Sequence, residues 1–159
     1  MILSTQSLNQ YVIGLAKALD TRGFEIRAGP IAEFDESGLV AFSVTGAIGD
    51  GDGGDPAEII LEEVWRPLAE RRWERREYTY DLVDRPRGRR RAFHLHDRDL
   101  AESVWGTVVH EHCEEVLGQP ACGHYLGREL PDGYHGIELL TAAWVEPGDL
   151  DCSSLICLG

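Results

Sequence analysis

Histidine and cysteine side chains, which can bind transition metals or transfer protons, are concentrated in one part of this 159-residue chain. Five of the six histidines and two of the four cysteines lie between His94 and His124. Zinc prefers imidazole and thiolate ligands in a tetrahedral arrangement, and histidine is the side chain that titrates closest to neutral pH. A metal site or a catalytic site is therefore expected in this segment.

The first candidate is a zinc site with two cysteine and two histidine ligands. The apolar pattern predicts a helix over residues 99–117, on which His110 and Cys113 share one side while His112 points elsewhere. A Gly-Gln-Pro turn after this helix folds the chain back toward that pair. The predicted zinc ligands are His110, Cys113, Cys122 and His124. Their spacing matches no standard zinc finger, so the alternative is that neighbouring groups satisfy ordinary core and surface side chains.

The second candidate is a pair of proton-transfer residues, His94 and His96. Residues two apart in a strand point to the same side, so both imidazoles can reach one target. Glu111 or Glu114 would orient them. Such a group could supply the acid and the base for cleavage of a nucleotide or RNA phosphodiester. The sequence has no G-x-G-x-x-G segment and no P-loop, so it does not point to NAD or ATP.

Charge is distributed unevenly along the chain. The formal net charge is −13, which argues against general nucleic-acid binding because neutralising phosphates needs a positive field. Yet 11 of the 15 basic residues, and only 6 acidic ones, lie between Arg66 and Arg98, a segment that we call the basic ridge. The ridge is interpreted as solvated secondary structure, with a protein-facing or RNA-facing surface as the alternative. We expect a protein partner or a homodimer.

No apolar stretch approaches the roughly 20 residues that span a bilayer, and the first residues do not resemble a secretion signal. We therefore expect a cytoplasmic protein without a membrane segment. Four cysteines in a reducing compartment fit structural, metal-binding or reactive roles better than a disulfide framework.

Hydrophobic periodicity predicts the elements that would position these residues. Helices are expected over residues 4–19, 55–69, 99–117 and 133–144, the second of them kinked near Pro67. Strand hairpins are expected over residues 24–34 with 39–48, and over residues 73–83 with 89–96. This order predicts an α+β fold, an antiparallel sheet of about four strands with helices packed on one face. Residues 1–147 would form a single domain and residues 148–159 a C-terminal tail.

Between Arg91 and Trp144 the segments RAFHLHD, VVHEHCEEVLG, CGHY and DGYHGIELLTAAW resemble an uncharacterised family of small actinobacterial and actinophage proteins. The most specific piece is His110–Glu114, and the resemblance implies no activity. A looser, fold-level similarity is to small toxins of bacterial toxin-antitoxin pairs. The favoured hypothesis is a small binding or regulatory module with a zinc site. The alternative is a histidine-dependent hydrolase, with a link to toxin-antitoxin systems.

Overall fold

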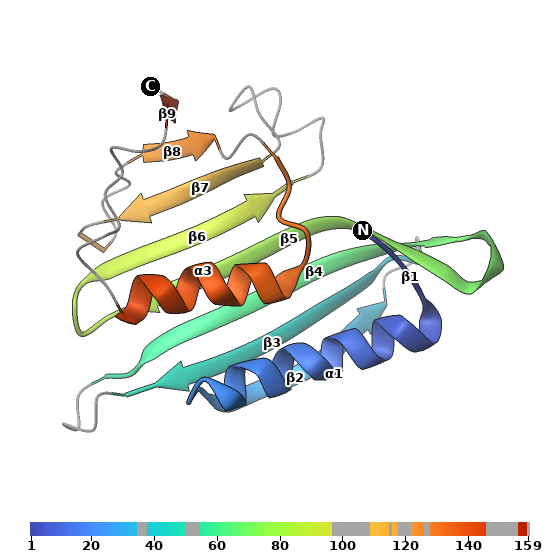
Figure 1. Ribbon diagram of the computed structural model, residues 1–159, viewed down its shortest axis with the longest axis horizontal. Coiled ribbons are helices and arrows are strands. Elements are labelled where there is room, and N and C mark those ends of the chain that lie inside the picture. Colours follow the sequence, from blue (N-terminus) through green and yellow to red (C-terminus); the bar gives the residue numbers. More distant parts are fainter. Residues whose placement is uncertain are drawn as a thin grey trace.

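A computed structural model of the chain describes residues 1–34, 38–49, 55–96, 109–114, 116–117, 122–125, 128–145 and 156–158. These residues form one large antiparallel sheet and two α-helices (Figure 1). The helices are α1 (Thr5–Thr21) and α3 (Gly133–Val145), and a short 3-10 turn covers Ala69–Arg71. The strands are β1 (Ile2–Ser4), β2 (Glu25–Phe34), β3 (Val40–Ile48), β4 (Ala57–Leu68), β5 (Arg72–Asp84), β6 (Arg89–Leu95), β7 (Val109–Glu114), β8 (Cys122–Tyr125) and β9 (Ile156–Leu158).

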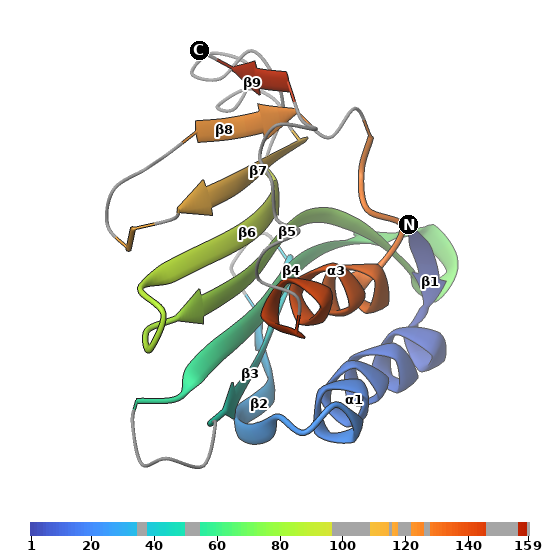
Figure 2. The ribbon, with the colours of Figure 1, turned by 60° about the vertical axis from the view of Figure 1, so that its left-hand side comes forward.

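The strands from β2 to β9 lie side by side in the order in which they occur in the chain, and β1 pairs with the start of β5. Both helices lie on the same face of this sheet (Figure 2). The mixed fold with helices on one face was thus predicted correctly, but the described sheet has nine strands where about four were expected. Among the described residues, no helix combines the length and the apolar character needed to cross a membrane.

The first helix and both predicted hairpins are confirmed. Five residues of α1 that follow the helical period are buried: Leu8, Tyr11, Val12, Leu15 and Leu19. Ser4 caps the helix, because its hydroxyl accepts a hydrogen bond from the backbone N–H of Ser7 at 3.2 Å. The hairpins appear as β2 with β3 and as β5 with β6, and the last predicted helix is α3.

The helix predicted over residues 55–69 is wrong, because residues 57–68 form β4. Buried and more exposed residues alternate along this strand, with Ile59, Leu61 and Trp65 in the core. Pro67 does not interrupt the pairing with β3, which ends opposite Trp65. A proline beyond the end of a neighbouring strand removes no ladder hydrogen bond on that side. The helix was predicted because Asp55-Pro56 has the residue types that begin a helix, a side-chain acceptor followed by proline, but the chain continues as a strand.

The helix predicted over residues 99–117 is also wrong where the structure describes it. Residues 109–114 form β7, which pairs with β6 on one side and β8 on the other. Residues 97–108 lie outside the described part of the chain. In the predicted tail, residues 156–158 form β9 against β8, and residues 146–155 lie outside the described part.

A buried polar network, which we call the Glu63 network, lies on the helix-bearing face. Glu63 is only 3% exposed, and its Oε1 accepts hydrogen bonds from the hydroxyls of Tyr11, at 2.6 Å, and Tyr80. The Arg75 guanidinium lies 3.4 Å from the same oxygen, and the Trp65 indole N–H donates to Oε2 at 2.9 Å. Both carboxylate oxygens of this buried charge are therefore satisfied by protein donors, as a structural charge requires.

The same network fixes where α3 lies. The backbone N–H of Gly133, at the start of α3, donates to the Tyr11 hydroxyl at 2.7 Å. One turn later, a Cβ on Gly136 would lie 2.4 Å from the Tyr80 ring, so only glycine lets α3 lie this close to β5. The two helices are thereby tied to the central strands, and the opposite face of the sheet is the one that carries the histidines.

Candidate metal site

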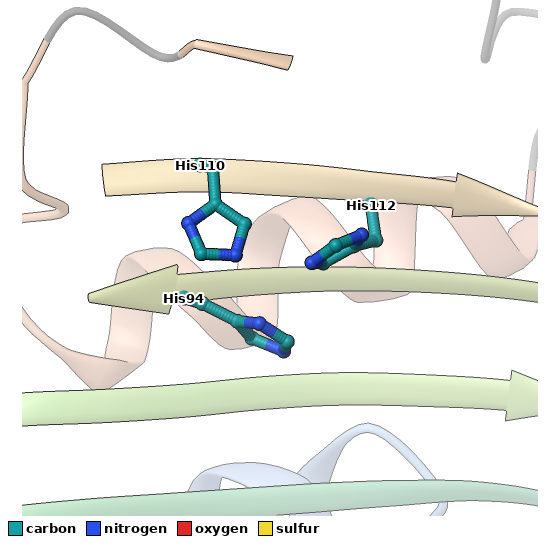
Figure 3. A group of neighbouring side chains, drawn as sticks. All are labelled: His94, His110 and His112. Carbon is teal, nitrogen blue, oxygen red and sulfur yellow. The ribbon is translucent and has the colours of Figure 1, made fainter. Parts of the chain in front are cut away.

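Four histidines gather on the face of the sheet that lies away from the helices. Phe93 and Leu95 of β6 belong to the helix-covered core, so His94 between them lies on the other face. The antiparallel register places His94 opposite His110 of β7, and Ala92 opposite His112. Figure 3 shows the imidazoles of His94, His110 and His112 on the near side of the strands, with α3 behind them.

Three of these side chains converge at metal-binding distance. One ring nitrogen from each of His94, His110 and His112 lies within 4.8 Å of the other two. The ring centroids are 4.7–5.1 Å apart, with that of His94 4.9 Å from that of His112. Three histidines from neighbouring strands are a donor set found in catalytic zinc sites. The grouping is compatible with a metal site shared by the three rings.

Two histidines of this cluster are buried, which is uncommon for a polar side chain. The exposed fraction is 8% for His94 and 2% for His110, and His112 is partly exposed. Among the described residues, neither ring nitrogen of His94 has a hydrogen-bond partner. A buried polar atom without a partner costs about 1–3 kcal/mol, so such atoms are rare unless a ligand or an ion supplies the missing bond.

The surroundings keep these imidazoles neutral. Burial, together with the charges of the neighbouring histidines, lowers the pKa of His94 to about 3 and that of His110 to about 4. Burial also lowers the pKa of His112, as does the Arg90 guanidinium beside it. Neutral imidazole is the form that binds a metal, so at neutral pH no proton has to leave these rings first. The same shifts make His94 a poor proton donor near neutral pH.

An ion-pair group borders the cluster beyond His112. Arg90 donates from Nε to both carboxylate oxygens of Asp81, at 2.9 Å each, and from Nη1 to Glu114 at 2.9 Å. These contacts raise the pKa of Arg90 above its usual value, with the Asp81 hydrogen bond as the largest raising cause. The two acids are thus engaged with arginine, and the three histidines remain the convergent metal donors among the described residues of this face.

His96 lies next to the three-histidine group at the end of β6. Its ring centroid is 5.1 Å from those of both His94 and His110. The same side chain lines a cavity of about 430 Å³. This cavity lies beside the part of β5 that is between its two partners. β5 pairs with β1 up to Glu74 and with β6 from Tyr78 onward. The other lining residues are Met1, Glu74, Arg75, Arg76, Leu95 and Glu129.

The predicted zinc ligands are not brought together as a set. Because residues 109–114 form a strand and not a helix, His110 and Cys113 lie on opposite faces of the sheet. The backbone register places Cys122 opposite Cys113 and His124 opposite Glu111, on the strand that follows. His112, which the helical reading turned away, is in the cluster.

The predicted catalytic residues are partly brought together. His94 and His96 are neighbours, as the strand spacing indicated. Glu111 is fully buried on the opposite face, where it pairs with Arg91, so it does not orient them. Glu114 shares their face but pairs with Arg90. The repeated H-x-H spacing, at residues 94–96 and 110–112, was the sequence signal for this cluster, since both pairs follow the period of a strand.

The basic ridge is largely made of paired arginines. Eight of its arginines lie within 4.0 Å of a carboxylate: Arg66, Arg75, Arg76, Arg85, Arg87, Arg89, Arg90 and Arg91. Pairing of this kind reduces the positive field that a phosphate backbone would need. Most of the ridge arginines thus have carboxylate partners within the chain, Arg75 is buried, and a partner surface stays a prediction.

Comparison with known proteins adds no relative that could carry a function to this chain. No family model, no curated protein and no solved structure matches it.

Proposed function

We propose that this protein is a small metal-binding module in which His94, His110 and His112 hold a zinc ion. The observation that supports this proposal most directly is the convergence of three ring nitrogens within 4.8 Å on a buried surface. Imidazole suits zinc and also copper, nickel and iron, and zinc fits a donor set made of neutral nitrogen atoms.

The energetics of the cluster support a resident ion. An ion bound to His94 would satisfy a ring nitrogen that has no partner in the described structure. It would also join β6 to β7 through side chains in addition to the backbone ladder. Metal binding of this kind contributes directly to folding free energy, so the module would be more stable when loaded.

The test is zinc content and affinity of the purified full chain, measured by elemental analysis and by calorimetric titration. The parent should bind zinc at this site, and His94→Ala and His110→Ala should each weaken that binding at least 100-fold. His135→Ala is the matched control, because His135 is an exposed histidine of α3 outside the cluster and should leave affinity unchanged. Equal zinc binding by the parent and both cluster variants would refute the proposal.

A second candidate function is a metal-dependent hydrolase acting on a nucleotide or RNA phosphodiester. Three protein ligands leave one coordination position for water or substrate, which is the arrangement of catalytic zinc sites. The specific observation in its favour is His96, which contacts the cluster and lines the adjacent cavity. His96 would then transfer the proton, in place of the buried His94.

This second function has its own test. The zinc-loaded protein should hydrolyse a chromogenic phosphodiester, and His96→Ala should abolish turnover while zinc content stays at the parent level. Turnover that survives this substitution would show that His96 does not transfer the proton. Absence of turnover in the zinc-loaded parent would contradict the hydrolase function and leave metal binding as the proposed function.

A further inference from the structure

The cavity beside His96 occupies a gap in the sheet. Both β1 and β6 pair with the edge of β5 that faces away from β4, because β4 pairs with the other edge throughout this region. The pairing with β1 ends at Glu74, and the pairing with β6 begins at Tyr78. The cavity has a volume of about 430 Å³, and small-molecule sites have volumes of about 300–1,000 Å³. The gap therefore has room for a ligand of about the size of one nucleotide.

Two charged residues of the cavity wall are already engaged by the protein. Arg75 is 4% exposed, and its guanidinium belongs to the Glu63 network. Oε2 of Glu74 accepts a hydrogen bond from Arg66. Arg76 lies 3.9 Å from the same oxygen, which is beyond hydrogen-bonding distance, and its side chain is 36% exposed. Among the described lining residues, Arg76 is therefore the cation that a ligand can pair with.

The side of the cavity next to the histidine cluster would supply a second positive centre. His96 lines the cavity, and its ring centroid is 5.1 Å from those of His94 and His110. An ion held by the cluster would therefore lie close to a ligand in the cavity. A phosphate monoester carries a charge of about −1.5 to −2 at neutral pH and has three acceptor oxygens. It matches an ion together with Arg76 better than a carboxylate, which carries a single charge.

The remaining lining residues suit a nucleoside. Glu129 is an exposed acidic residue, and Met1 and Leu95 are apolar. Acidic residues in dinucleotide-binding folds accept a hydrogen bond from a ribose hydroxyl. Apolar residues line most small-molecule sites and can pack against the face of a base.

We infer that this cavity binds a ribonucleoside monophosphate. Its phosphate pairs with Arg76 and faces the ion of the histidine cluster, and its ribose hydroxyls donate to Glu129. The inference rests on the proposed function, because the zinc ion supplies the second positive centre. It also gives the second candidate function a product: water adds across one P–O bond of a phosphodiester, which gives a phosphate monoester and an alcohol. Since the cavity holds about one nucleotide, an RNA strand would be held by its end.

Calorimetric titration of the zinc-loaded full chain tests the inference, with adenosine monophosphate as the probe. Its Kd should lie below about 1 mM and be about 10-fold or more below that of adenosine, because the phosphate meets two positive centres. Arg76→Gln should weaken binding about 10-fold while zinc content stays at the parent level. Arg72→Gln is the matched control and should leave Kd unchanged, because Arg72 is an exposed arginine of the same strand and does not line the cavity.

A second variant tests the ribose contact. The parent should bind adenosine monophosphate more tightly than deoxyadenosine monophosphate, which lacks one ribose hydroxyl. Glu129→Ala should remove this preference, and a preference that persists in the variant overturns the role of Glu129. Equal Kd values for adenosine monophosphate and inorganic phosphate overturn the nucleotide assignment, because the site would then bind only an oxyanion.

The outcomes also separate this inference from the proposed function. A parent that contains zinc and does not bind adenosine monophosphate overturns the inference and leaves the metal site intact. A parent that holds no zinc contradicts the metal site instead. Binding of the nucleotide that is still weakened by Arg76→Gln would then support the cavity as a nucleotide site.

Discussion

The Glu63 network and the histidine cluster are buried polar groups on opposite faces of one sheet, and they are satisfied in different ways. In the Glu63 network both oxygens of the carboxylate accept protein hydrogen bonds, from Tyr11, Trp65 and their neighbours. In the histidine cluster, His94 is equally buried yet its ring nitrogens have no hydrogen-bond partner in the described structure. A buried polar group that the protein itself satisfies contributes to the fold, whereas a buried side chain such as His94, without a hydrogen-bond partner among the described residues, is suited to a ligand.

The largest expected effect on stability concerns the Glu63 network. Glu63→Ala leaves Arg75 buried without its carboxylate and should lower the free energy of unfolding by about 3–5 kcal/mol. Urea denaturation measures this change. Glu62→Ala, an exposed glutamate on the same strand, is the control and should change stability by less than about 0.5 kcal/mol. Similar losses in both variants would show that the network is not a special source of stability.

The next largest effect on stability should come from zinc binding at the histidine cluster. At a zinc concentration 100 times Kd, the parent should gain about 2.7 kcal/mol of stability, which raises Tm by several degrees. His110→Ala should lose this gain if the histidine cluster supplies it. The measurement is thermal unfolding with and without zinc. A parent Tm that does not change when zinc is added would contradict the proposal that this site binds zinc.

A smaller loss is expected when the Glu63 network loses one donor. Tyr11→Phe removes the hydroxyl that donates to Glu63 and accepts from the backbone N–H of Gly133. Stability should fall by about 2 kcal/mol, because both buried partners lose a hydrogen bond. Chemical denaturation gives the value, and zinc affinity measured on the same variant should equal that of the parent. A change in affinity would mean that the two faces are coupled.

The smallest effect on stability is expected for a substitution of His94 in the metal-free protein, and it gives the clearest contrast with Glu63. His94→Leu replaces a buried imidazole, which has no hydrogen bond to the described residues, with an apolar side chain. In the metal-free protein, stability should stay within about 1 kcal/mol of the parent or rise, whereas Glu63→Ala removes much more. Denaturation in the presence of a chelator tests this. A loss above about 3 kcal/mol would mean that the protein itself depends on the histidine.

Sequence reasoning predicted those parts of the fold that local signals determine. The apolar stripe of residues 4–19 and the turn residues of two hairpins predicted α1 and four strands correctly. The prediction failed for β4 and β7. In β4, capping chemistry at Asp55-Pro56 outweighed the two-residue alternation that follows, and β7 owes its conformation to strands on both sides.

The same error decided what could be predicted of the site. On a helix His110 and Cys113 share one side, whereas on a strand His110 and His112 share one face. Assuming the helical period in place of the strand period therefore led to the wrong set of metal donors. His94 and His96 were paired correctly because their segment was recognised as a strand. The convergence of His94 with His110 depends on strand register, which a single sequence does not specify.

The order of the strands also bears on how this chain folds. From β2 to β9 each described strand pairs with its neighbours in sequence, so most backbone pairing joins nearby parts of the chain. Proteins with such local contacts fold faster than those dominated by distant ones. Distant contacts include those of β1 with β5, of Tyr11 with Glu63 and of α3 with β5. We expect the hairpins to form early and the docking of α3 onto β5 to come late, so Gly136→Ala should speed unfolding and leave the folding rate nearly unchanged.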